Sequence, residues 1–105
     1  MKQLAYMIRR IVKMTFQKEE TATFEAIFEG AKKAIRNSSG CMGLELWKAK
    51  GEDTVYFTLS EWENEPALET YRNSLLFRET WAKTKVLFAD KPQAWSLDCV
   101  ARTDT

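Results

Sequence analysis

The sequence has no histidine among its 105 residues. Histidine is the most frequent general base near neutral pH, the usual partner of a serine or cysteine nucleophile, and the commonest protein ligand of zinc and of haem or non-haem iron. The usual forms of all these sites are therefore excluded. We expect neither a metal centre nor a bound cofactor.

Cysteine is also scarce. Cys41 and Cys99 are far apart in the sequence, and no CxxC pair is present. Two such residues are expected to be reduced thiols in a chain without a secretory signal. No apolar run reaches the roughly 18 residues needed to span a bilayer. Residues 1–10, MKQLAYMIRR, lack the apolar segment of a signal peptide. These features predict a cytoplasmic protein with no membrane association.

Neither sign of charge dominates, because sixteen Lys and Arg residues stand against fifteen Asp and Glu residues and give a net charge of +1. The two signs are mixed along the chain, so we expect no nucleic-acid partner. Hydrophobic residues make up 45% of the sequence, which is typical of a packed globular protein. We expect one domain over residues 7–100, with tails at 1–6 and 101–105.

The first half of the chain has the pattern of a strand followed by a helix. Residues 8–16 are rich in β-branched and aromatic side chains and predict a strand. One of its faces carries Arg10, Val12, Met14 and Phe16. Apolar residues from Phe24 to Ile35 then form a single helical stripe. Thr21 or Thr23 is expected to cap this helix, and residues 37–40 (NSSG) are expected to end it.

The second half predicts two strands, a helical region and a last strand. Residues 42–50 and 54–62 alternate as strands on either side of a turn at 50–53. Asn64 is a suitable N-cap for the following helix, and Pro66 fits its first turn. Residues 73–74 interrupt the helical pattern weakly. Beyond them one stripe continues through Phe77, Thr80, Trp81, Thr84 and Phe88. Residues 94–100 predict the fourth strand, with Trp95, Leu97 and Cys99 on one face.

The resulting order, β-α-β-β-α-β, predicts an α+β protein of the ferredoxin-like type, with a four-stranded antiparallel sheet and helices on one face. Two helices cover only one face of such a sheet. Ile11, Trp47 and Trp95 are expected on the other face, where apolar side chains need a second cover. We therefore predict a homodimer that packs sheet against sheet.

The segment from Trp62 to Phe77 resembles a known signature, W-x-x-x-x-A-L-x-x-[HY]-x-x-S-x-x-F, of the antibiotic biosynthesis monooxygenase family. The matching residues are Trp62, Ala67, Leu68, Tyr71, Ser74 and Phe77. The resemblance implies a dimeric α/β barrel of ferredoxin-like subunits, each with a small pocket between sheet and helices. Characterised members oxygenate polycyclic phenols or quinols without metal or flavin, or degrade haem, and many have no known activity.

The haem-degrading branch of the family differs from this sequence at two positions. Its three functional groups are an asparagine on the first strand, a tryptophan at the end of the third strand and a histidine in the late helix. The tryptophan matches Trp62, whereas the asparagine and the histidine align with Val12 and Trp81. Without a histidine to ligate iron, the resemblance does not extend to haem degradation. The histidines of quinol-oxidising members are also replaced, one by Tyr71 and one near Leu76.

The candidate substrate-binding residues are Trp62, Tyr71, Phe77, Trp81 and Arg10. Trp62 could stack on a flat aromatic substrate and donate a hydrogen bond from its indole N–H. Tyr71 is the candidate catalytic residue; it could orient a substrate hydroxyl, since acting as a base would need a large fall from its usual pKa of about 10. Arg10 stands on an otherwise apolar face and needs a partner or a ligand anion. The alternative is that the aromatic residues fill the core and that Arg10 reaches solvent at the strand edge.

Two functions are open from the sequence. The first is a cofactor-independent monooxygenase for a small aromatic phenol or quinol. The deprotonated substrate itself passes an electron to O₂, so the protein needs only an apolar pocket and one or two polar groups. The second is a non-catalytic dimeric domain of the same fold that binds a small aromatic molecule or fills its own pocket. A pocket packed solid by Trp62, Tyr71 and Trp81 would favour the second.

Overall fold

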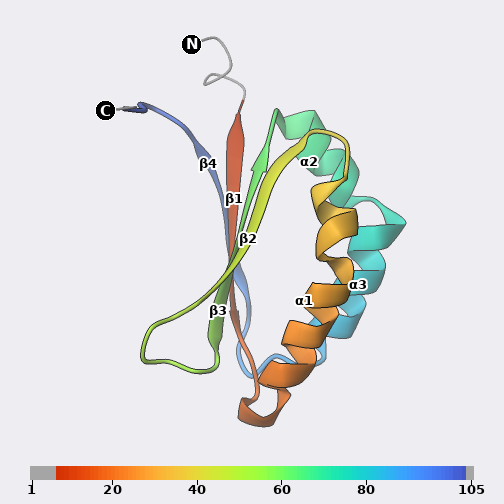
Figure 1. Ribbon diagram of the computed structural model, residues 1–105, viewed down its shortest axis with the longest axis vertical. Coiled ribbons are helices and arrows are strands. Elements are labelled where there is room, and N and C mark those ends of the chain that lie inside the picture. Colours follow the sequence, from red (N-terminus) through yellow and green to blue (C-terminus); the bar gives the residue numbers. More distant parts are fainter. Residues whose placement is uncertain (1–6, 104–105) are drawn as a thin grey trace.

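The computed structural model describes residues 7–103. Its elements follow the predicted order (Figure 1), with the late helical region divided in two. In chain order they are β1 (Ile8–Thr15), the short 3₁₀ helix η2 (Lys18–Glu20), α1 (Thr21–Arg36), β2 (Cys41–Lys48), β3 (Val55–Trp62), α2 (Glu65–Arg72), α3 (Leu75–Lys85) and β4 (Gln93–Asp98). Of the expected tails at 1–6 and 101–105, residues 1–6 and 104–105 lie outside the described residues, and residues 101–103 belong to no helix or strand.

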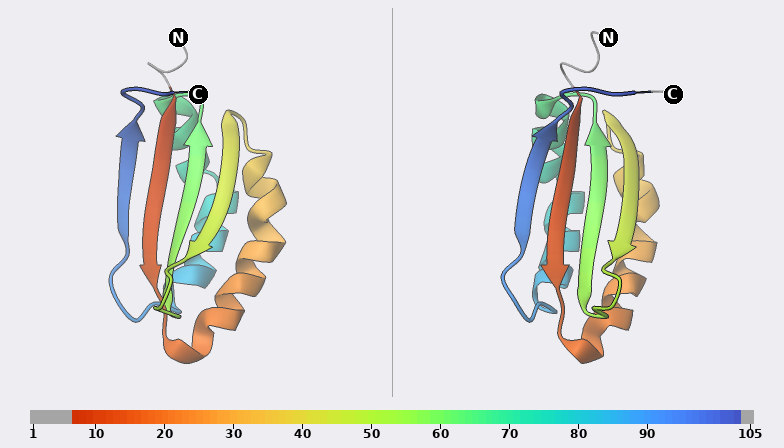
Figure 2. Two further views of the ribbon diagram at one scale, coloured as in Figure 1. Left: turned by 60° about the vertical axis from the view of Figure 1, so that its left-hand side comes forward. Right: turned by 90° about the vertical axis from the view of Figure 1, so that its left-hand side faces the viewer.

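The four strands form one antiparallel sheet in the order β2-β3-β1-β4. The three α-helices cover one face of this sheet (Figure 1), and the opposite face carries no helix (Figure 2). This is the predicted ferredoxin-like α+β arrangement. The register places Arg10 of β1 opposite Ser60 of β3 and Ser96 of β4. These three residues therefore lie side by side on one face of the sheet.

The core on the helix-covered face consists of two clusters. Met14, Phe16, Phe24, Tyr56 and Leu87 form the first, and Ile8, Cys41, Trp62 and Leu68 form the second. Met14 pairs with Tyr56 at one end of the sheet, and Ile8 pairs with Trp62 at the other. Burial of each large apolar side chain contributes about 1.5–3 kcal/mol. The two clusters join the sheet to the helix layer at the two ends of the strands. The middle of the helix-covered face lies between the two clusters.

The start of α1 differs from the prediction. Thr21 is the first helical residue, Thr23 lies inside the helix, and the residue before them, Glu20, makes no side-chain capping bond. Its backbone angles, φ −108° and ψ 2°, belong to the preceding 3₁₀ turn. An N-cap side chain acts from extended backbone. The chain enters α1 without such a residue, so the prediction of a threonine cap is wrong.

The weak interruption predicted at residues 73–74 is a complete break between α2 and α3. Ser74 has extended backbone angles, and its side chain accepts a hydrogen bond from the backbone N–H of Phe77. Phe88, predicted on the same helical stripe, lies beyond the end of α3 and forms a β-bridge with Phe16. Ser74 therefore starts a new helix by capping it, although the apolar pattern of the sequence continues through this position.

The strands are shifted by one or two residues from the predicted ranges. β4 ends at Asp98, so Cys99 lies past the strand rather than on a face with Trp95 and Leu97. β2 begins at Cys41 and ends at Lys48. Cys41 is buried, Cys99 is half-buried, and both thiols are free within the described chain. None of the helices described is long and apolar enough to cross a membrane.

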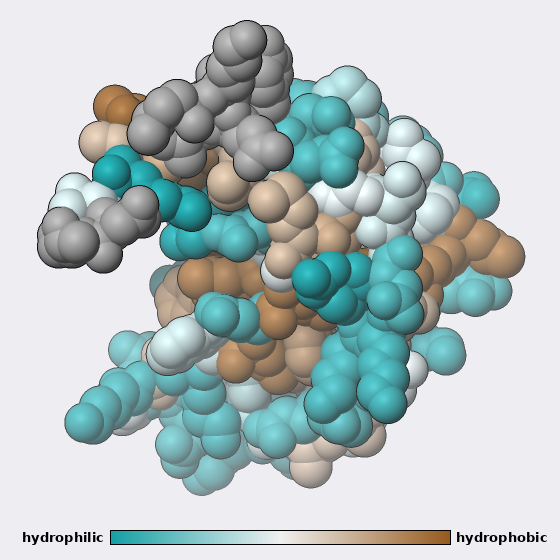
Figure 3. Space-filling view, turned by 45° about the horizontal axis from the view of Figure 1, so that its top comes forward, coloured by the Kyte–Doolittle hydropathy of each residue, from teal (hydrophilic) through white to brown (hydrophobic). Residues whose placement is uncertain are grey.

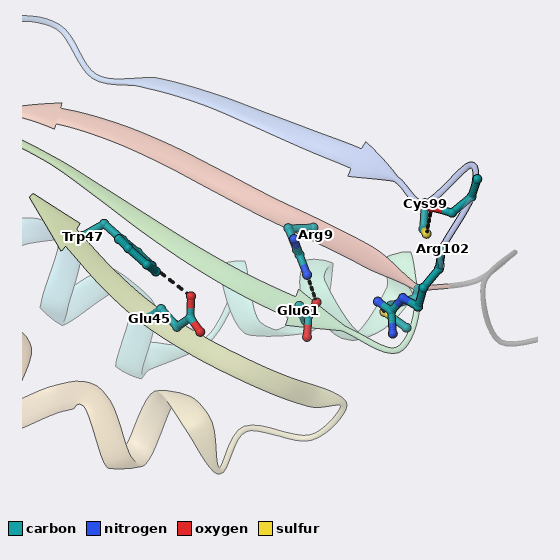
Figure 4. A network of polar contacts seen from close by, with 8 residues as sticks. Arg9, Glu45, Trp47, Glu61, Cys99 and Arg102 are labelled. Atoms are coloured by element: carbon teal, nitrogen blue, oxygen red, sulfur yellow. Dashed lines mark hydrogen bonds and ion pairs between the residues drawn. The ribbon is translucent and has the colours of Figure 1, made fainter. Parts of the chain in front are cut away.

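The uncovered face of the sheet carries a row of apolar side chains. Trp47 is 57% exposed, Trp95 43% and Leu97 44%, and the register puts Ile11 between Leu59 and Trp95. The polar groups here pair with one another: Arg9 forms an ion pair with Glu61, and the indole N–H of Trp47 donates to Glu45 (Figure 4). The residues predicted to need a second cover are thus on the face without helices.

Candidate functional site

A cavity of about 330 Å³ lies between the sheet and the helices. It separates the two core clusters, since Met14 and Phe24 of the first cluster and Trp62 and Leu68 of the second all line it. Figure 3 shows apolar residues in a hollow at the centre of one face, with hydrophilic residues around them. Ligand pockets commonly measure about 300–1,000 Å³. The space is therefore of a size for a small organic molecule.

All five candidate residues from the sequence line this cavity. They come from four elements: Arg10 from β1, Trp62 from the end of β3, Tyr71 from α2, and Phe77 and Trp81 from α3. The aromatic rings are in sequential contact. Ring centroids are 4.9 Å apart for Trp62 and Tyr71, 5.3 Å for Tyr71 and Phe77, and 5.9 Å for Phe77 and Trp81. They form a continuous aromatic wall.

Two helix caps place this wall. Asn64 has extended backbone angles, and its side chain accepts from the backbone N–H of Ala67 at 2.9 Å, as predicted. Ser74 does the same for Phe77 at 3.1 Å. Because α2 ends and α3 begins between them, Tyr71 and Phe77 meet edge to face across the break, with an interplanar angle of 78°. The local capping chemistry therefore fixes the geometry of the cavity.

Trp62 has a different polar contact from the one the sequence suggested. Its side chain is fully buried, and its indole N–H donates to the hydroxyl of Ser60 at 2.9 Å. The N–H is thus already paired within the protein. Ser60, which also lines the cavity, accepts this bond and keeps its own O–H to donate. The hydroxyl of Ser60 is the group that can reach a bound molecule.

Tyr71 is held as a neutral phenol. Burial raises its pKa to about 12, and the neighbouring Cys41 thiol acts in the same direction. Within residues 7–103 its hydroxyl makes no hydrogen bond. A phenol with a raised pKa keeps its proton at neutral pH, so Tyr71 can donate a hydrogen bond in the cavity but cannot act as a base.

Arg10 is half-buried at the cavity rather than fully in solvent. Its Nη1 donates to the hydroxyl of Ser96 at 3.0 Å. Burial and the nearby Arg72 lower the pKa of Arg10 from its usual value, while Glu69 acts in the opposite direction. Arg72 also lines the cavity and contacts Glu69 at 3.6 Å.

Sequence reasoning missed Ser60, Ser96 and Arg72. The period-2 alternation that placed Arg10 on the inner face also places Ser60 and Ser96 there once the strand register is known. The register was the missing information. Arg72 directly follows Tyr71; its side chain is exposed, yet it also borders the cavity.

The cavity does not fit haem chemistry of the family's kind. Val12 and Trp81, which stand at the positions of the asparagine and the histidine of the haem-degrading branch, both line it. Neither side chain can ligate iron. In the described range, 7–103, no three His, Cys, Asp or Glu side chains come together as a metal site.

The family comparison agrees with the signature around Trp62. The family described as antibiotic biosynthesis monooxygenase matches residues 7–83. The chain belongs to this family. The match contains β1 and the whole segment from Trp62 to Trp81, so it includes all five candidate residues. No curated protein matches the chain.

Solved structures of other proteins share the fold. A candidate antibiotic biosynthesis monooxygenase of Caulobacter crescentus CB15 is 25% identical, with 95% of each chain covered and a TM-score of 0.86. One from Bordetella bronchiseptica is 26% identical over 91% of this chain and 99% of that one, with a TM-score of 0.81. A conserved protein from Methanosarcina mazei Go1 is 17% identical over 91% and 95% of the two chains, with a TM-score of 0.86; this similarity concerns the fold alone.

Proposed function

We propose that the protein is a cofactor-independent monooxygenase that acts on a small aromatic phenol or quinol in the cavity between sheet and helices. The observation that carries this proposal is the cavity itself. Trp62, Tyr71 and Trp81 stand around an open space of about 330 Å³ rather than packing it solid. A core-only role for these residues would leave no such space.

The residues of the cavity suit a reaction in which the substrate does the difficult chemistry. An electron-rich phenol that has lost its proton passes one electron to O₂, and the resulting radical pair combines into a carbon–oxygen bond. In the substrate hydroperoxide so formed, the oxygenated carbon loses its hydrogen as a proton, the O–O bond breaks and this carbon becomes a carbonyl. The substrate is thereby oxidised to a quinone, and the outer oxygen atom leaves as water. The protein's part is to exclude bulk water, to hold the ring flat against the aromatic wall and to stabilise the phenolate.

Tyr71 and Arg10 are the polar groups in this proposal. The Tyr71 hydroxyl donates a hydrogen bond to the phenolate oxygen, which its raised pKa permits because the proton remains on the tyrosine. The cationic Arg10 lowers the energy of an anion in the cavity. With no histidine in the chain, the substrate loses its proton to solvent before the cavity encloses it.

The assembly that we propose is a homodimer. The apolar side chains on the uncovered face, with Trp47 and Trp95 near its two edges, need a cover, and a second copy of the same sheet supplies a self-complementary one. As a further part of the proposal we place the protein in the cytoplasm, where the free thiols of Cys41 and Cys99 stay reduced.

The decisive experiment is O₂ uptake with a panel of dihydroquinones and polycyclic phenols, each corrected for its spontaneous oxidation. Tyr71→Phe removes the hydroxyl and keeps the ring, so it should lower kcat about 10- to 100-fold with little change in KM. Tyr56→Phe is the matched control, because Tyr56 is also buried but does not line the cavity. It should keep wild-type turnover.

Two results would contradict the proposal. One is the absence of O₂ uptake above background for every compound of the panel. Saturable binding of the same compounds without turnover would then favour the non-catalytic binding domain. The other is an equal loss of activity in Tyr71→Phe and Tyr56→Phe, which would assign the effect of Tyr71 to folding.

A further inference from the structure

The charged side chains that line the cavity are all cations. Of the described lining residues, only Arg10 and Arg72 carry a charge, and none is an aspartate or a glutamate. Arg72 has Glu69 as a partner at 3.6 Å, whereas Arg10 forms no ion pair within residues 7–103. Glu69 also attracts Arg10, but its ion pair is with Arg72. A half-buried guanidinium without an ion-pair partner is unfavourable, and an anion in the cavity would relieve it.

The sheet register places a row of polar side chains across the sheet at the position of Arg10. Ser60, Arg10 and Ser96 are direct cross-strand neighbours on β3, β1 and β4. The next pair towards the centre, Val12 and Thr58, and the pair at the other side, Ile8 and Trp62, are mainly apolar. On β4 the neighbour of Ile8 is Asp98, an exposed carboxylate at the edge of the sheet. The row is therefore a localised polar site between two mainly apolar pairs of β1 and β3.

The hydrogen bonds of this row leave donors free. The Ser96 hydroxyl holds one N–H of Arg10, which fixes the guanidinium and leaves its other N–H groups unpaired. Ser60 accepts from Trp62 and keeps its own O–H. A planar guanidinium matches the two oxygens of a carboxylate, and the Ser60 hydroxyl, a further donor, lines the same cavity as Arg10. The flat apolar part of the same ligand would lie on the ring wall.

We propose that the cavity takes an aromatic ligand that carries a carboxylate, and that Arg10 and Ser60 bind this carboxylate. Arg72 adds a second positive charge at the site. This inference rests on the proposed function in taking the cavity as the substrate site, and it narrows the substrate to phenols or quinols with an acidic substituent.

The test compares binding of 2-naphthoate and 2-naphthamide, which have the same shape and differ in charge. Titration calorimetry on the folded wild-type protein should show binding of the naphthoate about tenfold or more tighter than that of the amide. In Arg10→Gln most of this preference should be lost and only the attraction of Arg72 should remain, with affinity for the amide unchanged within about twofold. Raising the salt concentration should weaken the naphthoate alone.

The matched control is Arg78→Gln, which removes the same charge from an exposed position on α3 that does not line the cavity. It should keep the wild-type preference. Ser60→Ala should reduce the preference partially, and circular dichroism confirms that each variant is folded.

The inference is overturned if the wild type binds both probes equally or binds neither, or if Arg10→Gln and Arg78→Gln have the same effect. Its failure can be separated from failure of the proposed function by the O₂-uptake assay. Turnover of neutral quinols without any carboxylate preference leaves the monooxygenase standing and removes the carboxylate site. A clear preference for the carboxylate without any turnover keeps the carboxylate site and removes the monooxygenase function.

Discussion

The indole of Trp62 stacks on the phenol ring of Tyr71, with centroids 4.9 Å apart and planes inclined by 26°. Trp62 ends β3 and Tyr71 lies near the end of α2, so this contact joins the sheet to the helix layer. The stack also forms one wall of the cavity. Trp62 therefore supports the site and completes the second core cluster.

Truncation of Trp62 should destabilise the protein strongly. The side chain is 0% exposed, and Trp62→Ala would enlarge the cavity and remove the support of Tyr71. We expect the free energy of unfolding to fall by about 3–5 kcal/mol. Trp62→Phe keeps a ring against Tyr71 and should cost less, about 1–3 kcal/mol. Urea unfolding followed by circular dichroism measures both. A loss below about 1 kcal/mol in Trp62→Ala would contradict this structural role.

Much of the fold could be predicted because its signals are local. Strand alternation, the stripe from Phe24 to Ile35 and the cap at Asn64 each depend on residues close in sequence. The signature from Trp62 to Phe77 also lies in one continuous segment, and it located the aromatic wall. These predictions needed no knowledge of which strands pair.

The polar half of the site could not be predicted in this way. Ser60, Arg10 and Ser96 meet only through the register of three strands, with a sequence separation of up to 86 between the members of a pair. The indole N–H of Trp62 was expected to face a ligand, but it pairs with Ser60 two residues earlier on the same strand face. A choice of rotamer decides this contact, and the residue pattern does not determine it.

Gly40 should be intolerant of any side chain. Its φ of +81° lies in the left-handed region, and a Cβ there would stand 2.5 Å from the Cβ of Ala67 in the first turns of α2. Neither atom can move without shifting backbone. Gly40→Ala should lower the free energy of unfolding by about 2–5 kcal/mol, the sum of backbone strain and overpacking.

Gly51 offers the control for this prediction. Its φ is +85°, yet a Cβ there would meet nothing within 4 Å. Gly51→Ala should cost only the backbone strain, about 1–2 kcal/mol. Thermal and urea unfolding of both variants give the comparison. Equal losses of unfolding free energy would mean that the close approach of residue 40 to Ala67 adds nothing to the cost of a side chain at this position.

Alkaline pH should destabilise the fold through Tyr71. Its pKa is raised to about 12 in the folded protein, mainly by burial and to a smaller extent by Cys41. In an unfolded chain the pKa is about 10. The folded state therefore holds this proton more tightly. The contribution of Tyr71 to stability is fully present below pH 10 and is lost as the pH rises to 12, by up to about 2–3 kcal/mol.

The measurement is the free energy of unfolding of wild type and Tyr71→Phe at pH 8 and at about pH 11. The variant should lose less stability between the two values. It should still lose some, because burial and Glu25 also raise the pKa of Tyr56 to about 12. An identical pH dependence in the two proteins would contradict a buried, neutral Tyr71.

The uncovered sheet face gives the last prediction. If a second copy covers it, the wild type should have about twice the monomer mass of 12.2 kDa by light scattering at micromolar concentration. The double variant Trp47→Lys and Trp95→Lys places charges near both edges of this face and should be monomeric, because a buried interface would leave them unpaired.

The control for this dimer test adds the same two lysines elsewhere. Leu75 and Val86 are 62% and 66% exposed, at the start of α3 and just past its end, on the helix side of the molecule. Leu75→Lys with Val86→Lys should remain dimeric. A monomeric wild type, or a dimer that survives lysines at Trp47 and Trp95 but not those at Leu75 and Val86, would refute the sheet-to-sheet arrangement. A dimer that is broken only by lysines at Leu75 and Val86 would place the interface on the outer surface of the helices.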